Sequence, residues 1–499
     1  MSSLTRNALA GAAWNYAGAA VLVVVQIAST ATTARLVSPK EFGAYATAQA
    51  AAGIFGYFTL GAVAQDILRR PELGSKTVGT AVSISLACAT AVAVTTFLVA
   101  GAWSSAWHVP SAEPLVRVFA LSLLLLSYAI VPLALLRRRL RFRTAAILET
   151  GSQVIGITAG ILLALQMHSA MALAIGQAIA AGILIVGAVA LTRGELALGF
   201  DGEEVRKLSS FAGRVTATNL AFFSLYTAPS LLVARMFGAQ TLGLYSRANV
   251  IVTLPLNYLT TGLMKVMYPL YGRIGTEIAR TRALLTEALS VATGIVWPLF
   301  ALLAGASPIV VRLLLGHRWA GAAVLVELCV LIACGNLPWA LLTNASEAFG
   351  WMRLVWARQA IYLGVLVAGV ALVHFAGVGV VELLIAVAAA QWIAYGLTVL
   401  AFVRRDLLEP RLTINSHWIH AAVALVAFAG AAACEHVVRG RPIGLQVVAE
   451  LAVALGVGAA VIGGRFRFPA RLVLAERLSH VGMGSHSRLL IRMGFTTSR

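Results

Sequence analysis

Long apolar runs separated by short polar segments fill most of this 499-residue chain. Runs of about 17–25 apolar residues have the length of a helix that crosses the hydrocarbon core of a bilayer. We therefore predict an all-α membrane protein with about 14 transmembrane helices and no large extramembrane domain. The predicted spans are 12–33, 43–64, 78–101, 115–135, 145–165, 170–191, 212–233, 245–268, 284–305, 321–343, 359–376, 380–403, 417–435 and 444–464.

Charged residues make up only 11% of the chain, yet the formal net charge is +19. With the N-terminus in the cytoplasm, fourteen spans place 28 Lys and Arg residues on the cytoplasmic side, nine on the outer side and Lys265 within a span. This asymmetry is typical of membrane topology. It predicts that both termini are cytoplasmic, and it explains the basic charge without a nucleic-acid partner.

A sequence motif recurs at an offset of 200 residues. The segments 34–45 and 234–245 superpose without a gap at Ala34/Ala234, Arg35/Arg235, Gly43/Gly243 and Tyr45/Tyr245. Two similar halves are typical of transporters that rock one half against the other. We predict two pseudo-symmetric six-helix lobes around a central cavity, plus two extra helices. The predicted divisions are an N-terminal lobe at 1–195, a cytoplasmic linker at 196–211, a C-terminal lobe at 212–403, helices 13–14 at 404–464 and a basic cytoplasmic tail at 465–499.

Polar side chains inside apolar helices are costly and tend to face a cavity. Projection at 100° per residue groups several of them on shared helix faces. Lys265 is the strongest candidate, because it is the only Lys well inside an apolar run. The candidates for a substrate cavity are Lys265, Arg247, Asn257, Thr261, Asn15, Gln26, Asn219, Tyr226, Gln153 and Asn336; the candidates for ion coupling or gating are Glu149 and Glu347.

Each candidate also has a plainer interpretation. Stripes of Ser, Thr, Asn and Gly often serve only as seams between packed helices. Glu149 lies one turn from the Arg-rich segment 137–143, where an ion pair at the membrane interface is expected. Lys265 could extend its ammonium group to the inner surface. Arg35 and Arg235 lie at outer helix ends, where anchoring is expected. His417 and His420 are expected at the membrane interface.

The sequence contains no nucleophile elbow, no phosphate-binding Gly-rich loop followed by Lys-Ser/Thr, and no His/Cys metal motif. The four cysteines fall within apolar runs and are interpreted as small hydrophobic residues. We therefore expect no cofactor, no metal and no enzymatic activity.

Several motifs together resemble one family. These are Ala34–Tyr45 with its core Arg-Leu-Val-Ser-Pro-Lys-Glu-Phe-Gly, Leu242–Ala248, Leu313–Trp319, and Pro132 followed by the basic segment Leu136–Phe142. Their order and spacing over about residues 5–400 resemble the polysaccharide-transport branch of the multidrug/oligosaccharidyl-lipid/polysaccharide flippase superfamily. The sequence lacks the Arg inside span 1 that some relatives in the wider superfamily carry, so the resemblance leaves open which residue contacts a diphosphate.

The resemblance implies a flippase that translocates an undecaprenyl-diphosphate-linked oligosaccharide repeat unit by alternating access. It would act in the bacterial inner (cytoplasmic) membrane for exopolysaccharide or surface polysaccharide synthesis. Its partners would be membrane lipids, a polysaccharide polymerase and glycosyltransferases. Two alternatives stay open. A drug or cation antiporter of the same architecture would require acidic residues deep in the cavity. A membrane polysaccharide polymerase or ligase would usually present a large outer loop.

Overall fold

The computed structural model describes residues 3–59, 61–69, 74–194, 196, 198–273 and 278–463. These residues form seventeen α-helices and three short 3₁₀ helices, and no strand occurs among them. The prediction of an all-α fold is therefore confirmed. The chain divides into two compact units, Met1–Ser246 with Leu314–Gly316, and Arg247–Leu313 with His317–Arg499. The predicted basic tail at 465–499 lies outside the described residues.

Within the described part of the chain, ten helices are long and apolar enough to cross a membrane, and a shorter apolar helix covers Ile443–Ala459. The protein is thus a multi-pass membrane protein. Each of the fourteen predicted spans overlaps a helix, but the count of fourteen crossings stays a prediction.

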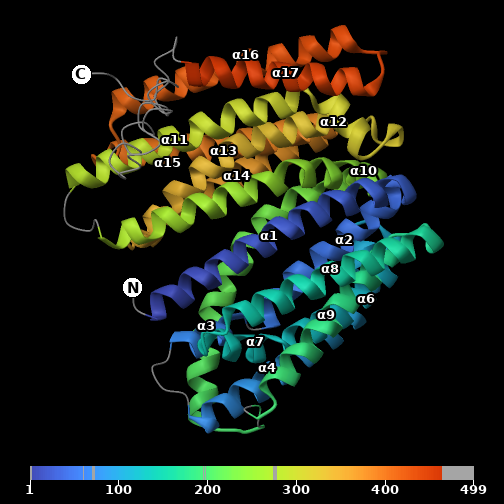
Figure 1. The fold of residues 1–499 in the computed structure, drawn as a ribbon, viewed down its shortest axis with the longest axis vertical. Coiled ribbons are helices and arrows are strands. Elements are labelled where there is room, and N and C mark those ends of the chain that lie inside the picture. The colour runs from blue at the N-terminus through green and yellow to red at the C-terminus, as the bar shows by residue number, and fades with distance from the viewer. Residues whose placement is uncertain are drawn as a thin grey trace. The chain divides into compact units, whose positions relative to one another are not determined.

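The first unit runs from blue to green in Figure 1. It contains eleven complete elements followed by the first part of α10 (Gly202–Arg273). The complete elements are α1 (Ser3–Leu36), α2 (Pro39–Gly56), η1 (Tyr57–Thr59), α3 (Gly61–Arg69), α4 (Ser75–Leu98), α5 (Ala100–Ala106), η2 (Pro110–Ala112), α6 (Glu113–Tyr128), α7 (Ile130–Arg138), α8 (Phe142–Met167) and α9 (Met171–Thr192).

Three spans predicted as continuous helices are broken, which corrects the sequence-based boundaries. The span 43–64 divides into α2, η1 and α3, and the span 115–135 divides at Ala129 between α6 and α7. The end of the span 78–101 passes Val99 into α5. The break at Ala129 has a local cause, because Pro132 has no N–H group and its ring would clash with the carbonyl group of Tyr128 in a continuous helix. Ala129, Leu133 and Leu136 around this break are buried against Ala145 of α8 and Leu184 of α9.

The connection between α9 and α10 is shorter than the predicted linker at 196–211. Helix α9 ends at Thr192 and α10 begins at Gly202. The backbone N–H groups of Gly199 and Asp201 donate to Ser83 Oγ (3.2 Å) and Thr80 Oγ1 (3.1 Å) on α4. Asp201 Oδ1 accepts from the N–H groups of residues 203 and 204, which makes Asp201 the N-terminal cap of α10. The connection is therefore fixed along the surface of its own unit.

Helix α10 contains two predicted spans, 212–233 and 245–268, on either side of a kink at Gly238. Gly238 has φ 78° and ψ 179°, a conformation that suits a residue without a β-carbon. The kink allows one span to end and the next to begin without an intervening loop.

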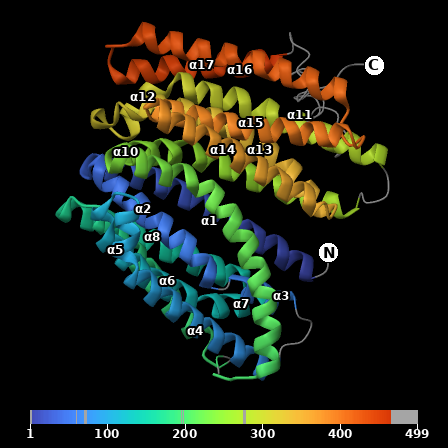
Figure 2. The same ribbon diagram turned by 180° about the vertical axis from the view of Figure 1, so that it is seen from behind.

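The second unit contains the rest of α10 and the helices that follow. These are α11 (Ile278–Gly305), α12 (Ser307–Leu314), η3 (His317–Trp319), α13 (Ala322–Ala348), α14 (Met352–Ala376), α15 (Val380–Val403), α16 (Pro410–Val438) and α17 (Ile443–Gly463). Helix α16 packs along α11, and Gly305 lets it approach closely: a β-carbon there would lie 2.6 Å from the carbonyl oxygen of Phe428. Both Figure 1 and Figure 2 show α17 beside α16.

The order of short elements supports the internal repeat. In the first half, α5 and η2 precede the long α6; in the second half, α12 and η3 precede the long α13. The contact-based units do not coincide with the predicted lobes, because residues 202–246 pack with the first unit. The lobe boundaries at 195 and 212 therefore stay predictions.

Candidate functional site

The two copies of the repeated motif contact each other within the first unit. A β-carbon on Gly43 would overlap the carbonyl oxygen of Ala239, and one on Gly243 would overlap the carbonyl oxygen of Pro39. The four positions are related by the same offset of 200 residues, so the contact has local two-fold symmetry. Residues 33–46 and 233–246 also share their degree of burial at every aligned position except 37/237 and 44/244.

Two charged residues of the motifs have structural partners. Arg235 Nη1 donates to the carbonyl oxygen of Ala106 (3.0 Å) and contacts His108 Nε2. Glu41 Oε2 accepts from Ser169 Oγ (2.7 Å) and from the N–H group of Ala170 (3.1 Å), at the start of α9. The anchoring interpretation thus fits Arg235 better than contact with a ligand.

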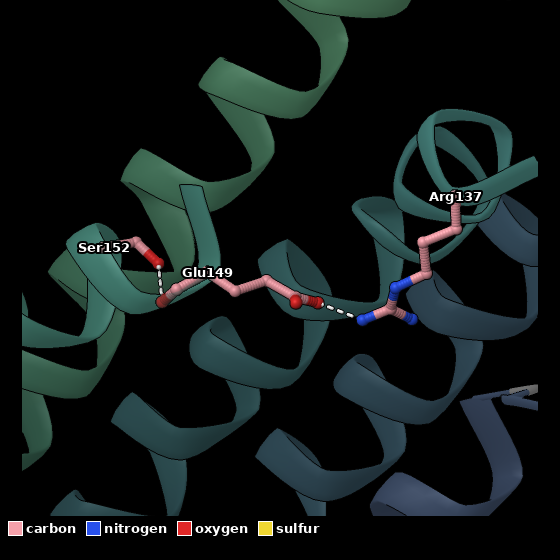
Figure 3. Close-up of polar contacts among 3 residues, drawn as sticks. All are labelled: Arg137, Glu149 and Ser152. Atoms are coloured by element: carbon pink, nitrogen blue, oxygen red, sulfur yellow. Dashed lines mark hydrogen bonds and ion pairs between the residues drawn. The ribbon is translucent and has the colours of Figure 1, made fainter. Parts of the chain in front are cut away.

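Glu149, a candidate for ion coupling or gating, forms an ion pair with Arg137 (Figure 3). Arg137 ends α7 and Glu149 lies on α8, and both side chains are half-exposed. Next to this pair, Arg138 Nη1 donates to the carbonyl oxygen of Ile67 at 2.8 Å. The geometry agrees with the plainer interpretation, in which Glu149 joins two neighbouring helices at one end of the unit.

Two glycines and the candidate Gln153 lie in different environments on α8. Gly156 and Gly160 pack against α9, where a β-carbon on Gly176 would lie 2.6 Å from the carbonyl oxygen of Gly156 and 2.9 Å from Cα of Gly160. These glycines therefore form a packing seam. Gln153 is half-buried.

The candidates on α10 differ in burial. Arg247 is only 9% exposed, whereas Asn257 and Thr261, one turn apart, are both exposed. Gln26 on α1 is exposed as well. The side chains of Lys265, Asn15, Asn219 and Tyr226 lie outside the described residues, so their assignment to a cavity stays a prediction.

The second unit contains a buried cation that the sequence analysis missed. The predicted span 359–376 leaves Arg358 just outside the membrane, but α14 begins at Met352 and the side chain is only 2% exposed. Its Nε donates to the carbonyl oxygen of Leu354 (3.2 Å), and its Nη1 donates to Thr398 Oγ1 on α15 (3.4 Å). The candidate Glu347 lies near this positive charge, at the end of the preceding helix α13.

Two other polar residues of the second unit, Asn336 and Glu327, lie on α13. The candidate Asn336 is half-buried. Glu327, which the sequence analysis did not select, accepts a hydrogen bond from Ser307 Oγ at 3.1 Å. Its position as a single Glu within an apolar run was a signal that could have identified it, because carboxylates inside the membrane are rare.

The structure gives His417 and His420 hydrogen-bond partners inside the protein, while their expected interfacial position stays a prediction. Helix α16 begins at Pro410, so both lie inside the helix. His420 is fully buried and its Nδ1 lies 2.9 Å from Thr293 Oγ1 in a hydrogen bond to α11. His417 hydrogen-bonds to Tyr395 on α15 at 2.5 Å. The predicted span began too late because the polar residues at 413–417 lowered the apparent hydropathy.

Within the described residues, no group of three or more His, Cys, Asp or Glu side chains could hold a metal ion. The four cysteines are free thiols. The described polar groups are instead dispersed cations, amides and hydroxyls on apolar helices.

Comparisons with known proteins agree with this picture. A family model described as "Polysaccharide biosynthesis protein" matches residues 33–324, more than half of the chain. The succinoglycan biosynthesis transport protein ExoT of Rhizobium meliloti (strain 1021) is 27% identical over 290 residues, which is 58% of this chain and 58% of ExoT. The lipopolysaccharide biosynthesis protein WzxC of Escherichia coli (strain K12) is 21% identical over 358 residues, or 71% of each chain. The chain thus spans less than two thirds of ExoT.

Solved structures show the same fold. The lipid II flippase MurJ in an inward closed conformation has a TM-score of 0.72 at 11% identity, covering 91% of this chain and 98% of MurJ. An inward-facing multidrug resistance MATE family transporter of the MOP superfamily has a TM-score of 0.56 at 15% identity, covering 77% of this chain and 94% of that one. At these identities the likeness establishes the fold alone.

Proposed function

Because this chain belongs to the polysaccharide biosynthesis protein family, we propose that it is a flippase for lipid-linked oligosaccharides. It transfers an undecaprenyl-diphosphate-linked repeat unit across the bacterial inner membrane, by alternating access of its two halves. The product supplies exopolysaccharide or surface polysaccharide synthesis. The observation that carries the proposal is the family match across 33–324, together with relatives named for the transport of succinoglycan and the biosynthesis of lipopolysaccharide.

The polar residues inside the apolar helices suit this substrate. Arg247 and Arg358 keep guanidinium groups within or beside membrane-crossing helices, where an uncompensated charge is costly. Guanidinium and ammonium groups form charge-assisted hydrogen bonds with phosphate oxygens. We assign Lys265 and Arg247 to the diphosphate. Neutral groups such as Asn257 and Thr261 suit sugar hydroxyls, and both are exposed on one face of α10.

The acidic residues favour a flippase over a drug or cation antiporter. A cation carrier needs carboxylates that are available to its substrate. Here Glu149 is paired with Arg137, Glu327 accepts from Ser307, and Glu347 lies in the field of Arg358. We retain Glu347 as the candidate for ion coupling or gating, because Arg358 offers it a partner that a proton or cation could replace.

The proposed cellular setting follows from the charge distribution along the chain. The excess of Lys and Arg on one side predicts that both termini are cytoplasmic. We propose that glycosyltransferases supply the lipid-linked unit on the cytoplasmic face, and that a polysaccharide polymerase consumes it on the outer face.

Deletion of the gene tests the proposal. The deletion strain is expected to lose its surface or secreted polysaccharide and to retain lipid-linked repeat units on the inner leaflet. A plasmid copy of the gene should restore export. Normal polymer export by the deletion strain, in the absence of any redundant transporter, would contradict the proposal.

A further inference from the structure

A cavity of about 420 Å³ lies between α11, α15 and α16 of the second unit. Its wall is largely aromatic: Trp297 comes from α11, Trp392 and Tyr395 from α15, and His417 and Trp418 from α16. Neighbouring rings contact one another, with centroids 5.5 Å apart for Trp297 and Trp392 and 5.2 Å apart for Trp297 and His417. The volume is within the range of roughly 300–1,000 Å³ that is usual for small-molecule sites.

The polar atoms of four of these rings, Trp297, Trp392, Tyr395 and His417, are already used within the protein. Trp297 Nε1 donates to the carbonyl oxygen of Cys334 (2.8 Å), and Trp392 Nε1 donates to that of Leu331 (3.0 Å). His417 Nδ1 lies 2.7 Å from the carbonyl oxygen of Thr413, and its Nε2 lies 2.5 Å from the Tyr395 hydroxyl group. A neutral His417 that donates from Nδ1 and accepts from Tyr395 satisfies both contacts. Since these four side chains offer ring faces rather than free donors, they suit a hydrocarbon chain.

The cavity is open towards the surroundings of the helices. Trp418 is 73% exposed and Ile414, also in the wall, is 59% exposed. Both lie on α16, which has the length and hydropathy of a membrane span. Apolar side chains exposed on such a helix meet lipid chains rather than water, so the bilayer supplies the occupant.

Two exposed arginines flank the cavity along the chain. Arg404 directly follows α15, five residues after Val399 of the cavity wall, and Arg411 lies two residues before Thr413 of the wall. At a helical rise of about 1.5 Å per residue, both are within about two turns of the cavity. Arginines placed where a span meets the membrane surface attract anionic lipid headgroups. The charge and the apolar cavity together match a lipid with a phosphate group and a hydrocarbon chain.

We propose that this cavity binds one acyl chain of a resident anionic glycerophospholipid, whose phosphate lies at Arg404 and Arg411. A transported lipid must carry its headgroup away to the opposite surface, whereas these arginines hold a phosphate at one surface. This distinction rests on the proposed flippase function. The bound lipid would fill the space between the appended helix α16 and helix α15 of the repeated part of the chain.

Fluorescence quenching tests the site in the full-length protein. The protein is reconstituted into bilayers that contain phosphatidylglycerol or phosphatidylcholine with brominated acyl chains, because bromine quenches tryptophans in contact with it. We expect brominated phosphatidylglycerol to quench more strongly than brominated phosphatidylcholine, with a preference of up to roughly thirtyfold in apparent affinity from two arginines beside an anionic headgroup. The Arg404→Gln/Arg411→Gln variant should lose this preference. Arg353→Gln, which removes an exposed charge from α14, should keep it.

A cavity-filling variant tests the position of the chain. A β-carbon on Gly396 meets no atom within 4 Å, so Gly396→Leu would extend into the cavity without disturbing the backbone. In this variant, brominated phosphatidylglycerol should no longer quench more strongly than brominated phosphatidylcholine. Gly364→Leu is the matched control, because Gly364 on α14 is equally unobstructed but outside the cavity. If Gly396→Leu fails to accumulate, the comparison of phosphatidylglycerol with phosphatidylcholine in the wild-type protein still tests the proposal.

Two results would overturn the proposal. One is equal quenching by phosphatidylglycerol and phosphatidylcholine in the wild-type protein. The other is relief of quenching by stoichiometric undecaprenyl phosphate, which would assign the cavity to a polyprenyl lipid. Lipid binding is measured without translocation, so a failure of the flippase proposal would appear in transport assays and not in this one.

Discussion

Gly43 of α2 and Gly243 of α10 face each other without an intervening side chain. A β-carbon on Gly243 would lie 3.1 Å from the backbone nitrogen of Gly43 and 2.6 Å from the carbonyl carbon of Pro39. The reciprocal β-carbon on Gly43 would lie 2.6 Å from the carbonyl carbon of Ala239. The repeated glycines are thus needed because the two copies of the motif pack backbone against backbone.

Substitution at this crossing should destabilise the protein. Gly43→Ala or Gly243→Ala forces the two backbones apart, and such overpacking typically costs about 1–3 kcal/mol. Gly182→Ala on α9 is the control, because its β-carbon would meet nothing within 4 Å and alanine favours a helix by about 1 kcal/mol. Thermal unfolding in detergent should show a lower midpoint for the first two variants and an unchanged or higher midpoint for the control. Equal midpoints for all three would contradict the close crossing.

Arg358 and Glu347 should behave as a coupled pair. Replacing either charge removes the attraction between the two residues, so Arg358→Gln and Glu347→Gln should each lower stability. The double variant should lose less stability than the sum of the losses in the two single variants. A coupling of about 0.5–3 kcal/mol is expected from residues in one network. Strictly additive shifts in the unfolding midpoints would show that the two charges do not interact.

The ion pair between Arg137 and Glu149 should contribute less to stability than the interaction of Arg358 with Glu347. Both side chains are half-exposed, and such pairs contribute about 0–1 kcal/mol. Glu149→Gln should therefore export polysaccharide at nearly the wild-type level with an almost unchanged midpoint. A strong loss of export at matched abundance would instead support a gating role for Glu149.

Lys265 should be required for the anionic headgroup. A charged Lys in an apolar span costs roughly 2.5–3.5 kcal/mol on insertion scales unless it is compensated. Lys265→Ala should keep expression but reduce export, and Lys265→Arg should retain more export than Lys265→Gln. Near-normal export in both the Ala and the Gln variants would indicate that the ammonium group only reaches the membrane surface. Polymer output at matched membrane abundance distinguishes these outcomes.

Reporter fusions should place both residue 499 and the segment 137–143 in the cytoplasm. The expectation rests on the predicted distribution of Lys and Arg residues, with 28 on the cytoplasmic side and nine on the outer side. An outer position for either reporter would contradict the model with fourteen crossings.

The sequence predicted what depends on local pattern and failed where packing decides. Hydropathy located every long helix, and the repeat identified Gly43 and Gly243, but not that the two glycines meet. The predicted span leaves Arg358 outside because hydropathy alone suggests that a helix begins beyond a charge, and its partner Thr398 is 40 residues away. The burial of His420 was likewise not predicted, since its partner Thr293 is 127 residues away. The break at Ala129 could have been anticipated from Pro132.

The most direct test of the flippase function is a transport assay with the purified protein. A lipid-linked oligosaccharide is incorporated into proteoliposomes, and its access to an added membrane-impermeant glycosidase is followed over time. We predict that, in vesicles with the protein, the glycosidase reaches the lipid-linked oligosaccharide of both leaflets. In protein-free vesicles it should reach only the oligosaccharide of the outer leaflet. A labelled phosphatidylcholine should stay in its leaflet in both cases. Access to the oligosaccharide of the outer leaflet alone in the presence of active, correctly folded protein would contradict the account.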